Sequence, residues 1–192
     1  GCFGFIAKAL SPDAMVHAFE PVARIANRHS ENRQVSGLDV ELFQQAVADE
    51  AGELPIHDPG GAHAYSASLD RDFLPGDKES YLVKVTTVDL HCKAHGLAPD
   101  LIKIDVEGIE GRLILGARQT LMTSKAVVVC EWTGNSSFHK AARALLEEAG
   151  YVTLDPVTGG EITLDEGRDH DDRNVIFCPT DRLKSLQALG PL

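Results

Sequence analysis

The stretch P-D-L-I-K-I-D-V-E-G-I-E at residues 99–110 decides the fold of this 192-residue chain. Leu101 to Ile104 is a short run rich in branched apolar residues, which is typical of a central strand buried on both faces of a parallel sheet. The run ends in acidic residues, Asp105 and Glu107, and Gly108 then permits a sharp turn because glycine adopts backbone conformations that other residues avoid. Helical spacing of apolar residues follows directly. The stretch therefore predicts a strand, an acidic turn and a helix.

Asp105 and Glu107 are the first candidate functional residues. In an open parallel sheet, ligands bind beyond the carboxyl ends of the strands, so this turn lies where a ligand cleft is expected. An acid at such a junction can also be a simple helix cap, and for Glu110, at the start of the helix, we favour that structural role. For Asp105 we favour a functional role, because it ends the strand that looks most buried.

The overall composition indicates one soluble globular domain, which we expect to span residues 1–192. The formal net charge of −11 argues against a nucleic-acid partner, because binding to the phosphate backbone depends on cationic patches. We find no signal-peptide pattern and no apolar run of about 18 residues, so we expect no membrane partner.

The four cysteines are widely spaced and form no C-x-x-C pair. Cys130 and Cys178 end apolar, strand-like runs, which favours buried free thiols over disulfide bonds. Free thiols indicate a reducing compartment, so we expect a cytoplasmic protein.

Strands and helices alternate along the chain, which predicts an α/β fold with a mostly parallel sheet. The last two expected strands have no full helix between them, so they are expected to form an antiparallel hairpin. The expected strands cover residues 15–19, 42–48, 54–56, 65–69, 83–87, 101–104, 126–130, 151–154 and 174–178. The expected helices cover residues 5–10 and 22–29, the segment that Thr86–Asp89 opens and Gly96 ends, the segment after Gly108, and residues 139–149.

Acidic residues recur at the ends of these strands. Glu20 follows the strand at 15–19, where an acid commonly binds two ribose hydroxyls, although it could equally cap the next helix. Asp49 could reach the exocyclic amine of an adenine or could simply begin a turn. With Asp105 and Glu131, these acids suggest a cleft shaped for a nucleoside. The acidic loop at 165–172 contains a histidine but lacks regular ligand spacing, so we predict a solvated loop and no metal site.

Several segments, in order and over nearly the whole chain, resemble the FkbM-type S-adenosylmethionine-dependent methyltransferases. The I-K-I-D-V-E-G-x-E block is the most specific of them. The matching segments are V-H-A-F-E-P at 16–21, A-V-A-D at 46–49, V-T-T-V-D at 85–89, L-I-K-I-D-V-E-G-I-E at 101–110 and L-G-A at 115–117.

The resemblance implies a Rossmann-like class I methyltransferase fold, in which the last strand of a seven-stranded sheet runs antiparallel. It also implies S-adenosyl-L-methionine as cofactor and methyl transfer to oxygen, commonly a hydroxyl of a sugar, polyketide or other small metabolite. By the same resemblance, Glu20 would bind the ribose, Asp49 would lie near the adenine, and Asp105 would lie near the methionine end. A hydroxyl nucleophile must lose its proton, and our candidates for the base are Asp105 and Glu107, with His139 and Glu131 behind them.

The chain departs from this family at its start. The family's first strand ends in an acid followed by a G-x-N-x-G turn that holds the methionine part of the cofactor. Here only the last glycine of that turn is present, as Gly1, which we assign to cofactor binding. We therefore expect that the natural protein begins earlier and that the first strand is missing from this chain.

Other functions stay open at this point. A strand-terminal acid on ribose also suits a nicotinamide-dependent oxidoreductase, and a G-x-G-x-x-G segment upstream would favour that enzyme. A metal-assisted methyltransferase that uses Asp105, Glu107 or Glu131 is a variant of the main reading. The chain could also be a non-catalytic binding domain with a nucleotide-like fold.

Overall fold

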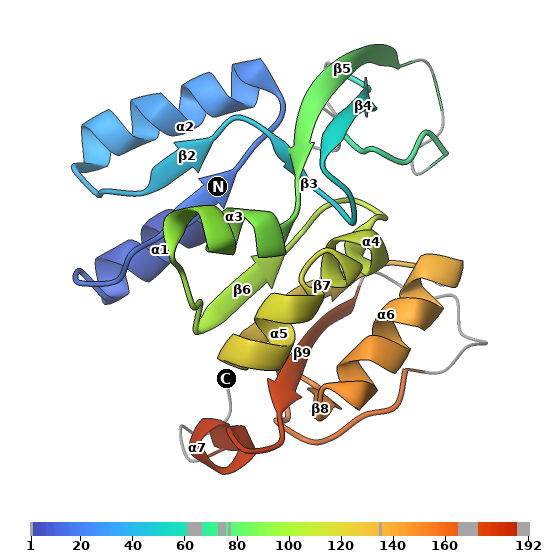
Figure 1. Ribbon diagram of the computed structural model, residues 1–192. Coiled ribbons are helices and arrows are strands. Elements are labelled where there is room, and N and C mark those ends of the chain that lie inside the picture. Colours follow the sequence, from blue (N-terminus) through green and yellow to red (C-terminus); the bar gives the residue numbers. More distant parts are fainter. Residues whose placement is uncertain are drawn as a thin grey trace. The chain divides into compact units, whose positions relative to one another are not determined.

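The computed structural model describes residues 2–60, 67–72, 76, 78–134, 136–164 and 173–187. Helices and strands are intermixed along it and its sheets contain parallel pairs, which confirms the predicted α/β class (Figure 1). The chain divides into two compact units, which we describe separately: unit 1 is Gly1–Val47 with Ala51–Thr86, and unit 2 is Ala48–Glu50 with Thr87–Leu192. The expectation of a single domain over residues 1–192 stays a prediction.

Unit 1 contains two small sheets. In the first, β1 and β2 pair in parallel, and in the second, β3 pairs in parallel with β5 while β4 pairs with β5 antiparallel. The elements are α1 (Cys2–Leu10), β1 (His17–Phe19), α2 (Ala23–Ser36), β2 (Glu41–Phe43), β3 (Ala46–Val47), β4 (Gly52–Asp58) and β5 (Glu79–Thr86).

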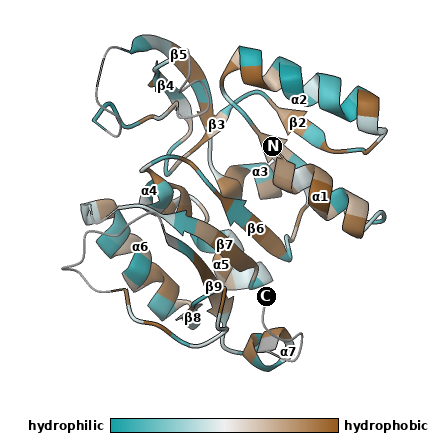
Figure 2. Cartoon of the chain, turned by 180° about the vertical axis from the view of Figure 1, so that it is seen from behind, coloured by the Kyte–Doolittle hydropathy of each residue, from teal (hydrophilic) through white to brown (hydrophobic). Residues whose placement is uncertain are grey.

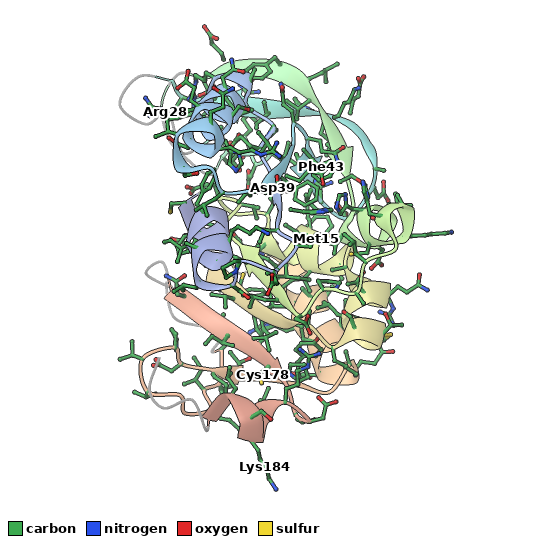
Figure 3. The ribbon with its side chains drawn as sticks, turned by 90° about the vertical axis from the view of Figure 1, so that its left-hand side faces the viewer. Met15, Arg28, Asp39, Phe43, Cys178 and Lys184 are labelled. Atoms are coloured by element: carbon green, nitrogen blue, oxygen red, sulfur yellow. The ribbon has the colours of Figure 1, made fainter. Side chains whose placement is uncertain are left out.

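Aromatic rings pack between β1 and β2. The ring of Phe43, which is labelled in Figure 3, lies 5.5 Å from the ring of Phe19 and 5.2 Å from that of His17, measured between centroids. Aligned parallel pairing of the two strands explains these contacts, because Phe19 is directly opposite Phe43. This packing fixes the end of β1, which is the strand that Glu20 follows.

Two sequence predictions for unit 1 were wrong in detail. The expected strand at 42–48 is two strands, because the backbone N–H of Gln45 donates to the carbonyl of Phe43 and breaks the extended run. Helix α2 continues to Ser36, beyond the predicted end at residue 29, because its polar second half keeps helical hydrogen bonds until Gly37, at φ +67°. Of the predicted strand at 65–69, residues 65 and 66 lie outside the described residues, and residues 67–69 form only an isolated antiparallel bridge between Ser68 and His57.

Unit 2 is built on a four-stranded sheet with the order β6-β7-β9-β8. Strands β6 and β7 are parallel, whereas β9 runs antiparallel to both of its neighbours, which confirms the predicted antiparallel last strand and hairpin. The elements are α3 (Val88–His95), β6 (Leu101–Ile104), α4 (Glu110–Leu115), α5 (Arg118–Ser124), β7 (Val127–Trp132), α6 (Ser137–Glu148), β8 (Tyr151–Leu154), β9 (Arg173–Pro179) and α7 (Leu183–Gln187).

Helices α4, α5 and α6 lie along one face of this sheet (Figure 1). Hydrophobic residues dominate β6 and β7, as Figure 2 shows, and the side chains of Val128, Cys130 and Trp132 on β7 are almost fully buried. Cys130 and Cys178 are free and buried, as predicted. The buried side of α6 is also the predicted one, because Ala142, Leu145 and Leu146 all face the core.

The prediction that residues 101–104 form a central strand buried on both faces was wrong for this chain. Strand β6 lies at the edge of the four-stranded sheet, and among the described residues it pairs only with β7. The residue Leu101 is also 56% exposed. The strand bounds and the acidic turn that follows them are nevertheless those predicted.

Candidate functional site

Asp105 and Glu131 lie side by side at the carboxyl ends of β6 and β7. The parallel register pairs Ile104 with Cys130, so the next position on each strand carries one of the two acids. Their side chains are hydrogen-bonded to each other, which requires one carboxyl group to be protonated. The sequence signal for this contact was an acid after each of two apolar strands, and the pairing register brings those acids together.

The electrostatics of this carboxyl pair centre on Glu131. The hydrogen bond with Asp105, then burial, then the negative charge of Asp105 raise the pKa of Glu131 to about 7 from its ordinary value of 4.5. The ammonium of Lys103 lies 3.4 Å from Oδ2 of Asp105 and opposes this shift. The charge of Glu107 adds to it. Glu131 therefore gains or loses its proton near neutral pH.

The turn after β6 has a strained backbone. Glu107 has φ +55° and Gly108 has φ +96°, so two successive residues occupy the left-handed half of backbone space. Glycine adopts this conformation without cost, but a residue with a Cβ is disfavoured there by about 1–2 kcal/mol. Such strain is found mostly where function requires a particular side-chain direction. The surrounding structure therefore holds the backbone of Glu107, and with it the direction of its side chain, in a conformation that is intrinsically disfavoured.

Glu110 is more than the helix cap that we predicted. Its side chain is fully buried, and it accepts hydrogen bonds from the backbone N–H of Gly108, the hydroxyl of Thr133 and the ring of His139. His139 was a reserve candidate for the base, but its ring is buried and both of its nitrogens have partners, Glu110 and Ser136. Local sequence pattern carried no signal for this pair, because 29 residues separate its members.

Asp49 lies in unit 2, in an ion pair with Arg112. The distance from Oδ1 of Asp49 to Nε of Arg112 is 2.6 Å, and the Asp49 side chain is only 18% exposed. The guanidinium carbon of Arg112 also lies 5.5 Å from the centre of the Phe138 ring. The structure thus gives Asp49 a defined partner of its own, and its predicted position near an adenine stays a prediction.

Glu20 lies in unit 1, directly after β1. Its Oε1 accepts a hydrogen bond of 2.8 Å from the backbone N–H of Val22, so part of the predicted helix-cap role is present. Burial raises the pKa of the Glu20 carboxyl. The charge of Arg24 opposes the shift, and Arg24 is itself bound to Asp58 with an N···O distance of 2.6 Å. Glu20 is therefore a partly buried acid beside a fixed ion pair.

The V-T-T-V-D segment has a structural role in unit 2. The hydroxyl of Thr87 accepts a bond from the N–H of Leu90 and caps α3, as predicted. The two carboxylate oxygens of Asp89 accept bonds from the backbone N–H groups of Gln119 and Thr120, which begin α5. One short segment therefore caps two helices. The second cap could not be predicted, because about 30 residues separate the acid from the amides it binds.

The candidate residues thus fall into separate groups. Asp105, Glu131 and Lys103 are in contact, and Glu107 follows on the same turn, whereas Glu20 and Asp49 each have partners of their own. Gly1 lies outside the described residues, as does the acidic loop at 165–172. Within the described part of the chain, no three His, Cys, Asp or Glu side chains are placed to hold a metal ion. In the same residues, no helix combines the length and the apolar character that crossing a membrane requires.

Comparison with known proteins identifies the family. Residues 2–153 match the methyltransferase FkbM domain. The chain belongs to the FkbM methyltransferase domain family. The matched FkbM region contains Glu20, Asp49, Asp105, Glu107 and Glu131, and it ends within β8.

Two individual proteins resemble this FkbM chain. The 2-O-methyltransferase NoeI of Sinorhizobium fredii is 29% identical over 133 residues, which cover 62% of the chain and 54% of NoeI. The chain thus spans about half the length of this curated relative. The second is the crystal structure of methyltransferase FkbM from Methylobacillus flagellatus KT. The structural match covers 90% of this chain and 39% of the Methylobacillus chain, with 15% sequence identity and a TM-score of 0.46.

Proposed function

We propose that this protein transfers a methyl group from S-adenosyl-L-methionine to the oxygen of a hydroxyl group on a small molecule or sugar. Membership of the FkbM methyltransferase family supports methyl transfer, and the name of the relative NoeI, a 2-O-methyltransferase, supports an oxygen acceptor. The structural observation that carries the proposal is the carboxyl pair of Asp105 and Glu131 at the ends of two parallel strands. A nicotinamide-dependent oxidoreductase gains no support from the family.

The acids after β6 and β7 fit the chemistry of this cofactor. When bound, S-adenosyl-L-methionine supplies a methyl group on a positively charged sulfur. Asp105, Glu107 and Glu131 place negative charge at the carboxyl end of the sheet, and this charge would complement the sulfonium. We assign the methionine end of the cofactor to Asp105. The proposed acceptor is uncharged, so this charge would act on the cofactor.

Two further acids are proposed to bind the nucleoside part of the cofactor. For Glu20 we propose hydrogen bonds to the ribose hydroxyls, which a carboxylate accepts strongly. Its Oε1 already accepts the N–H of Val22, which fixes the direction of the side chain. For Asp49 we propose a place near the adenine, with Arg112 holding the carboxylate in position. Gly1 is proposed to contact the cofactor through its backbone, as in the family pattern.

Removal of the hydroxyl proton is the step that requires a base. We propose that Asp105 and Glu107 are the catalytic residues, and that Glu131 assists by sharing its proton with Asp105. Glu131, whose pKa is raised to about 7, is suited to share a proton with Asp105 at neutral pH. Alignment of the hydroxyl oxygen with the methyl group supplies most of the rate, so the side chains that hold these groups in place matter as much as the base.

The role of Glu107 can be tested with the variant Glu107→Gln. This variant keeps the size of the side chain and removes its ability to accept a proton. We expect about a tenfold or greater loss of kcat, with the affinity for S-adenosylhomocysteine changed by less than about threefold. Glu147→Gln, an exposed site on α6, is the matched control and should behave as the wild type. If Glu107→Gln changes neither turnover nor affinity, Glu107 is structural.

The cofactor itself can be tested by calorimetric titration of S-adenosylhomocysteine. The titration should use this chain and a chain extended upstream with its natural sequence. Binding to either supports the proposal, and binding to neither contradicts it. Incubation with radiolabelled cofactor and a panel of sugars and other hydroxylated metabolites would then identify the acceptor class. The buried free thiols support a reducing compartment, and we place the protein in the cytoplasm.

A further inference from the structure

The side chain of Glu110 is fully buried at the first position of α4. Burial of a carboxylate is costly unless its oxygens are hydrogen-bonded. Here Oε1 accepts a bond of 2.9 Å from the backbone N–H of Gly108, and Oε2 accepts one of 3.1 Å from the hydroxyl of Thr133. The ring nitrogen Nε2 of His139 lies 3.0 Å from the same Oε2. Glu110 is thus bonded to the turn before its helix, to Thr133 directly after β7, and to α6.

The hydrogen bonds of His139 form a consistent chain. An ionised Glu110 can only accept, so Nε2 of His139 carries the hydrogen in that bond. The other ring nitrogen, Nδ1, lies 2.8 Å from the hydroxyl oxygen of Ser136, which can donate to it. The same oxygen caps α6 by accepting the backbone N–H of His139. Every polar atom of the imidazole therefore has a partner, although only 2% of the residue is exposed.

Packing holds the His139 ring in one position. The ring of Trp132 meets it edge-on, with 4.7 Å between the centroids. Gly134 covers it so closely that a Cβ there would lie 2.2 Å from Cε1 of the imidazole. Gly111 on α4 also lies close to the backbone of α6, because an added Cβ would lie 2.6 Å from the backbone nitrogen of His139. These close contacts bring α4 and α6 together at the height of Glu110 and His139.

We propose that Glu110 and His139 are positioning residues that clamp the acidic turn between Asp105 and Gly108. The bond from the N–H of Gly108 to Glu110 fixes the turn immediately after Glu107, whose φ of +55° needs support from its surroundings. His139 and Thr133 in turn fix the carboxylate of Glu110. The inference rests on the proposed function, because it assigns the clamp to the turn that carries the proposed base.

The burial of Glu110 and His139 distinguishes their role from that of the proposed catalytic residues. Glu110 is 0% exposed and His139 is 2% exposed, so neither side chain contacts a substrate. Their influence on the reaction therefore passes through the turn. Loss of the clamp should change the step in which Glu107 takes part more than the binding of either ligand.

The test compares His139→Phe with His139→Gln. Phenylalanine keeps a ring against Trp132 and removes both nitrogens, whereas glutamine retains an N–H donor for Glu110. We expect His139→Phe, and Glu110→Leu, which removes both acceptor oxygens, to accelerate hydrogen exchange at the Gly108 amide by about tenfold or more. We also expect kcat to fall by about tenfold, with the acceptor KM within about threefold of the wild type. His139→Gln should recover most of both losses.

The matched control is Ala142→Gly, a buried site on α6 outside the hydrogen-bond network. It lowers the stability of the same helix without removing any bond to Glu110. If Ala142→Gly accelerates exchange at Gly108 and lowers kcat as much as His139→Phe does, the positioning role is overturned. If the wild type transfers no methyl group, the proposed function fails. The exchange rates still decide whether the clamp exists.

A milder pair covers the case in which the His139 and Glu110 variants do not fold. Thr133→Val removes only the hydroxyl that donates to Glu110, and Thr133→Ser retains it. We expect Thr133→Val to accelerate exchange at Gly108 by about threefold and Thr133→Ser to leave it unchanged. Equal exchange rates in the two variants would overturn the proposal.

Discussion

At the scale of the residue, the left-handed backbone of Glu107 lowers the stability of the protein at a position that we propose to be catalytic. A left-handed residue with a Cβ costs about 1–2 kcal/mol, and replacement by glycine removes that cost while adding about 0.5–1 kcal/mol of unfolded-chain entropy. We therefore predict that Glu107→Gly is about 0.5–1 kcal/mol more stable than the wild type and lacks methyl transfer. Urea denaturation measures the first effect and turnover the second.

Glu107→Ala is the control for this comparison, because it removes the carboxylate and keeps the strained conformation. Alanine is more stable than glycine at most sites, so a reversed order at position 107 isolates the backbone strain. A Glu107→Gly variant that is less stable than Glu107→Ala would contradict the strained geometry.

A second residue-scale prediction concerns Glu131 and pH. The pKa of Glu131 is raised in the folded state to about 7, so its contribution to stability is fully present below about pH 4.5 and is lost as the pH rises through 7. Glu131→Gln cannot ionise and escapes this loss. We predict that Glu131→Gln gains roughly 1 kcal/mol relative to the wild type between pH 5 and pH 8, a modest value because the side chain is partly exposed to solvent.

Chemical denaturation at several pH values measures this gain. Glu147→Gln, which replaces an exposed glutamate on α6, should follow the wild type at every pH. A constant difference between Glu131→Gln and the wild type across this range would show that Glu131 ionises normally.

At the scale of the element, Asp89 joins α3 to α5. Its carboxylate accepts two backbone N–H groups at the start of α5, at 2.9 Å and 2.7 Å. A capping bond contributes about 1 kcal/mol, and the second bond adds to it. We predict that Asp89→Ala lowers the free energy of unfolding by about 1–3 kcal/mol.

Asp89→Asn retains an acceptor for one of the two bonds and should lose about half as much stability. Thermal unfolding of the two variants tests the order. Equal stability of wild type and Asp89→Ala would contradict the double cap.

The elements that could be predicted are those with both an apolar period and a capping residue. Helices α3 and α6 are examples, because Gly96 ends α3 and buried alanines and leucines recur along α6. Strand β6 was predicted from its apolar run and the acidic turn after it. Helix α2 was predicted too short because its second half is polar, and its helical form comes from backbone bonds that end at Gly37. The split of residues 42–48 depends on which strand each half pairs with, and a local pattern does not contain that information.

The candidate site was predictable only in part, for the same reason. An acid after each apolar strand identified Asp105 and Glu131, since parallel strands end at one edge of a sheet. The bonds of Glu110 with His139, and of Asp49 with Arg112, join residues 29 and 63 positions apart. Such contacts depend on how α4 packs against its neighbours. Glu110 and Asp49 could therefore be identified from the sequence, but their partners could not.

At the scale of the whole molecule, the net charge of −11 favours a cation over its neutral counterpart. S-adenosylmethionine carries a positive sulfur, and S-adenosylhomocysteine carries the same nucleoside and amino acid without that charge. We therefore predict that the site with Asp105, Glu107 and Glu131 binds S-adenosylmethionine more tightly than S-adenosylhomocysteine. Since Glu131 loses a proton near pH 7, this preference should grow by roughly threefold between pH 6 and pH 8.

The most direct test is calorimetric titration of both ligands at pH 6 and pH 8, into the wild type and into Glu131→Gln, with the upstream-extended chain alongside. The proposed function predicts that both ligands bind, that S-adenosylmethionine binds more tightly, and that its advantage grows with pH in the wild type alone. Binding of neither ligand to either chain, or a preference that is unchanged by pH and by Glu131→Gln, would contradict it.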